Sequence, residues 1–186
     1  MSRKKEIQIE VPKQNTVAQV KDTTQSISGN VNIKLQQGRN TIKTINIHNT
    51  ATLDLLYGML LSLSDNIDKN KLPRFIGVGT GTTEDNTTDW TELKDEITIT
   101  RTILTSNYKG PPKKDTVNGT VSVVYQGIIP YSDLGVTSNI KEIGLFGTQT
   151  GNSLLARVQV DDSISVSQGQ SLIIEWTFKI QNYLGV

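Results

Sequence analysis

The chain contains no cysteine, so disulfide bonds, thiolate nucleophiles and cysteine-ligated metal sites are all excluded. Aromatic residues make up only 5% of the sequence, so a core has to be built mainly from isoleucine, leucine and valine. The 19 basic and 18 acidic residues leave a formal net charge of +1. This balance gives no long-range field that would attract nucleic acid or anionic lipid. We therefore expect neither nucleic acid nor a membrane as a partner.

The sequence also lacks a targeting or membrane-spanning segment. The N-terminal residues 1–7 carry charge but are followed by no apolar stretch, which excludes a secretory signal peptide. The most apolar run, residues 53–63, is interrupted by Asp54 and Gly58. It is shorter than the roughly 20 apolar residues that a membrane helix needs. These features predict a soluble protein that is made in the cytoplasm.

A catalytic set is missing as well. His48 is the single histidine, and a lone histidine without cysteines cannot form a zinc site. The glycine-rich run 77–81 resembles a phosphate-binding loop, but no lysine follows Gly81 and residues 82–89 are not helix-forming. We interpret this run as a buried strand with close backbone packing that ends in a tight turn. The sequence thus predicts no catalytic, metal or cofactor site and a protein that is not an enzyme.

What the sequence does contain is a repeated alternation of aliphatic and polar residues, which is typical of half-buried strands. The clearest strand, near the C-terminus, places Leu172, Ile174, Trp176, Phe178 and Ile180 on one face. Leucines at helical spacing predict one short helix within residues 53–63. Many short strands separated by turns predict a mainly β protein, an antiparallel, jelly-roll-like β-sandwich over residues 31–186.

Residues 1–30 are polar and have too few apolar side chains to form a core of their own. Within them Ile7, Ile9 and Val11 alternate with polar residues, and Pro12 ends the alternation. One interpretation is an extended N-terminal assembly arm that lies on a neighbouring subunit. The other is a tail without a binding partner, and the sequence leaves both open.

Three charged residues, Arg101, Glu142 and Arg157, lie inside strands with apolar neighbours, and Arg101 alternates in step with Ile97, Ile99 and Ile103. A hairpin that turns near Thr150 brings Glu142 roughly opposite Arg157. Because an unpaired buried charge costs several kcal/mol, we expect Glu142 to pair with Arg157, with Arg101 or with both, as a structural polar brace. The competing interpretation, a catalytic carboxylate beside an arginine, lacks a nucleophile.

Several segments together resemble a loose group of virion proteins of tailed bacteriophages. They are residues 75–83 followed by Thr91, Leu93, Glu96 and Arg101, the segment Ile140–Phe146 (I-K-E-I-G-L-F), the segment Leu154–Val158 (L-L-A-R-V) and the strand of residues 172–180 around Trp176. The E-I-G-L-F … L-L-A-R hairpin is also similar to segments of phage tail-fibre and tail-collar proteins. The resemblance extends over residues 40–181.

The resemblance implies a non-enzymatic structural component of a bacteriophage virion, made in the host cytoplasm and present in several copies. Its partners would be other virion proteins and copies of itself, a homo-oligomer at the capsid surface, neck or tail. An alternative is a carbohydrate- or receptor-binding β-sandwich of a tail-fibre or adhesion apparatus, which would use exposed loop aromatics such as Trp90, Tyr108 and Tyr131. A hydrolase with an unfamiliar site is the third hypothesis.

Overall fold

The computed structural model describes residues 26–51, 55–59, 68–82, 91–97, 101–105, 112–134 and 139–181. The arm residues Ile7, Ile9 and Val11 lie outside these ranges, as do Trp90 and Tyr108.

The described part of the chain forms nine strands and two short 3-10 helices. In chain order the strands are β1 (Ser26–Gln37), β2 (Asn40–Ala51), β3 (Phe75–Gly79), β4 (Thr102–Ile103), β5 (Lys113–Asp115), β6 (Thr120–Pro130), β7 (Ile140–Phe146), β8 (Leu154–Ile164) and β9 (Gln170–Gln181). The 3-10 helices are η1 (Lys69–Lys71) and η2 (Tyr131–Asp133), and residues 55–59 form a helical turn.

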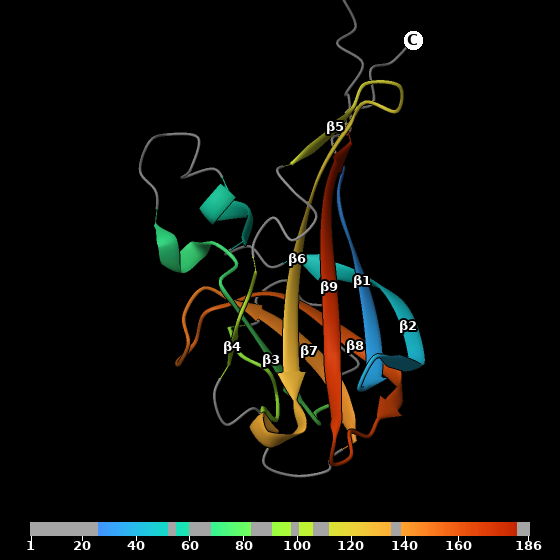
Figure 1. The fold of residues 1–186 in the computed structure, drawn as a ribbon. Coiled ribbons are helices and arrows are strands. Elements are labelled where there is room, and N and C mark those ends of the chain that lie inside the picture. Colours follow the sequence, from blue (N-terminus) through green and yellow to red (C-terminus); the bar gives the residue numbers. More distant parts are fainter. Residues whose placement is uncertain are drawn as a thin grey trace, which may run out of the picture.

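These strands make two antiparallel sheets that lie face to face (Figure 1). Sheet A has the order β2-β1-β9-β6-β5, and sheet B has the order β4-β3-β7-β8. The sheets meet along one side, where Thr50 and Ala51 of β2 pair with β8. On the other side the bridge between Thr105 and Gln126 connects the end of β4 to β6. The prediction of a mainly β, antiparallel β-sandwich is confirmed.

The hairpins form at glycines that adopt a left-handed backbone conformation. Gly38 (φ 59°) turns β1 into β2, and Gly119 (φ 59°) turns β5 into β6. Residues with a Cβ rarely adopt such positive φ values, whereas glycine does so at no steric cost. Antiparallel strands pair on either side of both turns.

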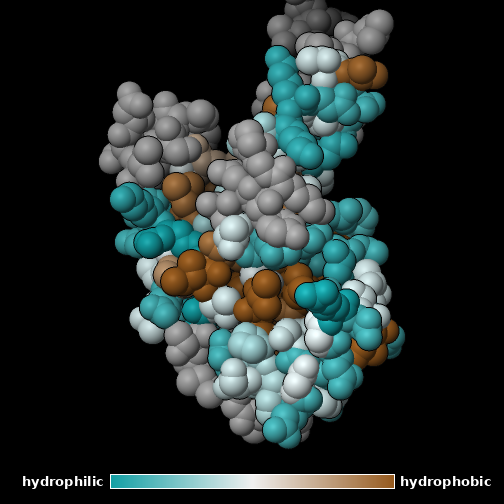
Figure 2. Space-filling view, viewed as in Figure 1, coloured by the Kyte–Doolittle hydropathy of each residue, from teal (hydrophilic) through white to brown (hydrophobic). Residues whose placement is uncertain are grey.

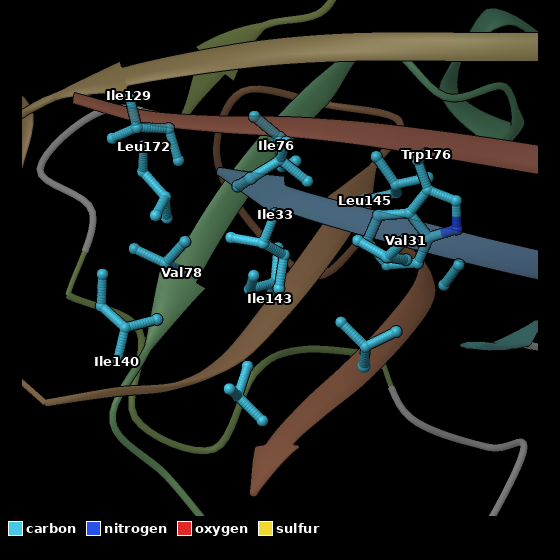
Figure 3. Packing of buried hydrophobic residues seen from close by; sticks show 14 of the residues in the cluster. Val31, Ile33, Ile76, Val78, Ile129, Ile140, Ile143, Leu145, Leu172 and Trp176 are labelled. Atoms are coloured by element: carbon cyan, nitrogen blue, oxygen red, sulfur yellow. The ribbon is translucent and has the colours of Figure 1, made fainter. Parts of the chain in front are cut away.

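The core lies between the two sheets and is mainly aliphatic, with Trp176 as its largest fully buried side chain. Side chains from β9, β1, β3 and β7 meet there and are almost completely buried (Figure 3). The alternation predicted for β9 is observed, since Leu172, Ile174 and Trp176 are 0% exposed and Phe178 is 6% exposed. Full burial of an aliphatic side chain contributes about 1.5–3 kcal/mol, so this alternation supplies much of the stability of the fold.

Sheet A is longer than sheet B, and its central strands extend beyond the sandwich as a ribbon (Figure 1). Pairing between β1 and β9 continues to Ser26 opposite Gln181. The sheet therefore begins at Ser26, five residues before the boundary at residue 31 that the composition suggested. Backbone pairing with β9 places residues 26–30 in the sheet even though their side chains are mostly polar.

The helix expected within residues 53–63 is described at residues 55–59, where Leu55 is 2% exposed and belongs to the core. None of the helices in the described ranges has both the length and the apolar character needed to cross a bilayer.

The prediction that Arg101 and Ile103 share one face of a continuous strand is wrong. Arg101 is 6% exposed, whereas Ile103 is 70% exposed. The physical reason is that β4 is only two residues long and begins after Arg101, so the two side chains do not belong to one regular alternation.

Candidate functional site

Sheet B is covered on both faces, and the charged residues of interest lie on its outer face. On β7, Ile143 and Leu145 point into the core, so Glu142 and Phe146 point to the opposite side. There Phe146 packs with Leu93, which comes from the loop of residues 91–97. This loop therefore closes the outer face of sheet B and removes Glu142 from solvent.

Glu142 is 0% exposed, and both of its carboxylate oxygens are fully used. Oε1 accepts hydrogen bonds from the backbone N–H of Gly81 (3.2 Å) and of Asp95 (2.9 Å). Oε2 accepts from the backbone N–H of Lys94 (3.3 Å) and from Nε of Arg157 (3.1 Å). A carboxylate offers about four acceptor positions, so no position on Glu142 remains for a substrate or a metal.

Glu142 and Arg157 form the pair that the hairpin suggested. Their closest charged atoms, Oε2 and Nη2, lie 3.1 Å apart, and the side chain of Arg157 is 9% exposed. In the β7–β8 register Glu142 is opposite Gln159 and Arg157 is opposite Gly144. The two charged side chains are thus diagonal neighbours on one face of the sheet, a separation that a long arginine side chain can span.

The glycine-rich run 77–81 makes room for this carboxylate. A Cβ added to Gly79 would lie 2.6 Å from Oε1 of Glu142, and one added to Gly81 would lie 2.5 Å from the same atom. Gly81 also donates its backbone N–H to Glu142. The backbone that resembles a phosphate-binding loop therefore binds an anion of the protein itself, and the interpretation as a buried, closely packed strand is confirmed for Phe75–Gly79.

Arg101 pairs with Glu96 and not with Glu142, so this part of the predicted brace is corrected. Its Nε and Nη2 donate to the two carboxylate oxygens of Glu96 at 2.8 and 2.7 Å. Its Nη1 donates to the backbone carbonyls of Thr148 (3.2 Å) and Gly151 (2.8 Å). The guanidinium carbon lies 3.5 Å from the centroid of the Phe146 ring, which adds a cation–π contact.

The two ion pairs belong to one assembly, which we call the polar brace: Glu96, Arg101, Glu142 and Arg157. The segment of residues 94–96 connects them, because Lys94 and Asp95 donate backbone N–H groups to Glu142 while Glu96 binds Arg101. Glu96 also forms a backbone bridge with Gly79 of β3. The brace thus joins β3, β7, β8, the covering loop and the turn after β7.

The sequence did not indicate that Glu96 is the partner of Arg101. The charge of Glu96 lies five positions before Arg101, in a segment that reads as a polar connection followed by a strand. A turn at residues 94–95 folds this segment back onto sheet B. The one available signal was that a buried arginine needs an acceptor, and Glu96 is the nearest carboxylate in the sequence.

The other titratable groups do not gather into a site in the part of the chain that is described. His48 is exposed on β2. No group of three or more histidine, aspartate or glutamate side chains that could hold a metal is found among the described residues.

Among the described residues, two groups away from the brace have a shifted pKa. The side chain and backbone N–H of Asn118 donate hydrogen bonds to Asp115 in the β5–β6 turn and lower the pKa of this carboxyl group. Burial raises the pKa of the Tyr125 hydroxyl group, because the ionised form is disfavoured away from water. Neither group has a partner arrangement that indicates acid–base catalysis.

Comparisons of this chain with protein-family models, with curated proteins and with solved structures found no match.

Proposed function

We propose that the protein is a non-enzymatic structural component of a bacteriophage virion that assembles through protein–protein contacts at the capsid surface, neck or tail. The observation that supports this proposal is that residues of the segments that resemble phage virion proteins contact one another in the fold. Three of these segments come together at the polar brace. Gly79 and Gly81 of the first segment make room for Glu142 of the second, and Glu142 pairs with Arg157 of the third.

The brace favours a scaffold over a catalytic centre. All acceptor positions of Glu142 are occupied by groups of the protein, and the carboxylate has no contact with solvent. A catalytic carboxylate needs to reach a reacting group within hydrogen-bond distance. The brace instead fixes how the loop of residues 91–97 is attached to sheet B, which is a structural role.

The outer face of sheet A supports assembly through protein contacts. Ile128 of β6 is 48% exposed and is the register neighbour of the half-buried Ile173 of β9. Continuing the antiparallel bridge between Thr105 and Gln126 by two residues places the 70% exposed Ile103 beside Ile128. Figure 2 shows the resulting hydrophobic patch across the middle of this face. Apolar patches rimmed by polar residues are typical of protein interaction sites.

The alternative of a carbohydrate-binding module gains no support from the described residues. Of the three loop aromatics considered for it, Tyr131 is half-buried and packs against the core. The other two, Trp90 and Tyr108, lie outside the described ranges. We therefore retain the structural proposal alone.

Quantitative mass spectrometry of purified particles, from the virus whose genome encodes the chain, tests this proposal. We expect the chain in a fixed, multi-copy ratio to the major capsid protein, and we expect this ratio to survive repeated density-gradient purification. A chain found only in the soluble fraction of infected cells, with none in the particles, would contradict the proposal.

A further inference from the structure

Along most of one edge of the long strand β2, no other described strand is paired with it. On its inner side it pairs with β1 from Asn40 to Asn49. On its outer side, among the described strands, it pairs only through Thr50 and Ala51, with β8. Figure 1 shows β2 curving along the side of the sandwich with this edge facing outward. Unpaired backbone N–H and C=O groups along an edge strand form a template for a further strand.

The side chains along this edge are also incompletely buried. Ile45 and Ile47 are the cross-strand neighbours of Ile33 and Val31, which are each 1% exposed. Ile45 and Ile47 pack against the same core but remain half-buried. The two rows of core side chains therefore end at β2 with apolar surface that one more strand would cover.

The chain contains a strand that matches this edge. Residues 6–11 read Glu-Ile-Gln-Ile-Glu-Val and end at Pro12, so their three aliphatic side chains fall on one face.

We propose that residues 6–11 of one copy pair with the free edge of β2 in a second copy, with Ile7, Ile9 and Val11 completing the rows that end at Ile45 and Ile47. The proposal rests on the proposed function, since it names the contact through which copies would assemble. Addition of an extended segment to a sheet edge is a general recognition mode in which backbone hydrogen bonds supply affinity and alternate side chains supply specificity.

The direction of the chain favours a second copy over the arm of the same copy. The described chain begins at Ser26, at the far end of β1, and β1 already lies between β9 and β2. To reach the free edge of its own β2, the connection would have to cross β2 or pass the end that is paired with β8. Connections in sheets rarely cross in this way. At about 3.3 Å per residue, residues 12–25 extend to about 46 Å at most, which is enough to reach an adjacent molecule.

Disulfide trapping in the full-length chain tests the inference. Because the protein has no cysteine, only the introduced cysteines can form disulfides. We would mix an isotope-labelled arm variant (Ile7→Cys, Ile9→Cys or Val11→Cys) with an unlabelled edge variant (Ile45→Cys or Ile47→Cys) in concentrated solution. After mild oxidation, peptide mapping would identify labelled arms joined to unlabelled edges. Neighbouring strands hold Cα atoms about 4.5–5.5 Å apart, which is within the range that a disulfide can bridge.

The matched control uses the opposite face of the same two strands. Gln8→Cys and Asn46→Cys both lie on the outward face, so we expect them to cross-link with each other. We expect mismatched pairs, Gln8→Cys with Ile47→Cys and Ile9→Cys with Asn46→Cys, to give only background yield. On β2, Ile45 and Ile47 are half-buried and Asn46 is exposed, so the edge variants should retain the wild-type melting temperature, which circular dichroism checks for all variants.

Three results would overturn the inference. They are cross-links that form only within one chain, cross-links that join two β2 edges, and yields that do not depend on the face. Any of these could occur in a chain that is still present in purified particles, which would leave the proposed function standing. Conversely, face-specific cross-linking between copies of a chain that is absent from particles would support the pairing and contradict the virion role.

Discussion

The outer face of sheet B is covered and its charged groups are paired within the protein, whereas sheet A leaves apolar side chains and backbone groups of an edge strand uncovered by other described residues. On sheet B the loop of residues 91–97 covers the strands, and the polar brace uses every acceptor of Glu142 internally. On sheet A, isoleucines are exposed on the outer face, and β2 keeps an unpaired edge among the described strands. We infer that sheet B determines the shape of the protein and that sheet A provides its contacts with other chains. Four experiments test this difference between the two sheets.

The largest effect is expected from Glu142→Gln. The substitution removes the negative charge that pairs with Arg157, so the buried charge of Arg157 loses its partner. It also places an NH2 group against backbone N–H donors. We expect a loss of about 3–5 kcal/mol in the free energy of unfolding, measured by urea denaturation. The matched control is Glu175→Gln on sheet A, where the contact with Lys34 is 3.4 Å long and Lys34 is 32% exposed. The Glu175 side chain is itself only 10% exposed, but its partner Lys34 is partly in water, so we expect a smaller loss there than in Glu142→Gln. Equal losses in the two variants would remove the distinction between the sheets.

Arg101→Lys should be the next most damaging change. Lysine cannot reproduce the two parallel hydrogen bonds to Glu96 or the planar contact with Phe146. We expect a loss of about 2–3 kcal/mol, from charged hydrogen bonds worth about 1.5–3 kcal/mol each. Arg74→Lys is the control, since Arg74 is exposed and its guanidinium lies 5.4 Å from the ring of Phe75. If Arg101→Lys unfolds at the same urea concentration as Arg74→Lys, the pair of Arg101 with Glu96 does not stabilise the fold.

A smaller effect separates the centre of sheet A from its edge. Ile33→Val removes a methylene group at a position that is 1% exposed, and we expect it to cost about 0.5–1.5 kcal/mol. Ile45→Val, on the neighbouring strand in the same row, should cost less because Ile45 is half-buried. Thermal unfolding at low protein concentration measures both. An equal or larger cost at Ile45 would mean that the edge is already covered in the single chain.

The smallest effect is local and depends on pH. The side chain of Asn118 donates a hydrogen bond to Oδ2 of Asp115, and the backbone N–H groups of Asn118 and Val117 donate to Oδ1. These bonds hold the pKa of Asp115 below its ordinary value of 3.8. Because the folded-state pKa is depressed, the stabilisation is present above pH 3.8 and is lost as the pH falls through the lowered pKa. Amide hydrogen exchange at Asn118, after correction for intrinsic rates, should therefore accelerate only at acid pH. Asp115→Asn should abolish that acceleration, and a pH-independent rate in the unaltered chain would contradict the assignment.

The sequence was most informative where a regular backbone carries the pattern. The alternation in β9 and the hairpin between β7 and β8 follow from side-chain period and turn residues, so the burial of Trp176 and the pairing of Glu142 with Arg157 were predictable. The partner of Arg101 was not predictable, because it depends on how an irregular loop returns to sheet B. The role of Gly79 and Gly81 was predictable as close packing, but the packed atom, Oε1 of Glu142, comes from a strand more than 60 residues away.

The arm illustrates a different limit. Its alternation of Ile7, Ile9 and Val11 predicts a strand, yet a strand's partner is set by an edge that the sequence alone does not display. In the pairing proposed above, that edge is the side of β2 that no other described strand covers before Thr50.

A cryo-electron microscopy map of the purified virus particle tests the central claim most directly. The account predicts repeated copies of this sandwich at the capsid surface, neck or tail, with sheet B closed over the polar brace and sheet A turned toward neighbouring chains. A map at side-chain resolution in which every ordered density is assigned to other proteins would contradict it.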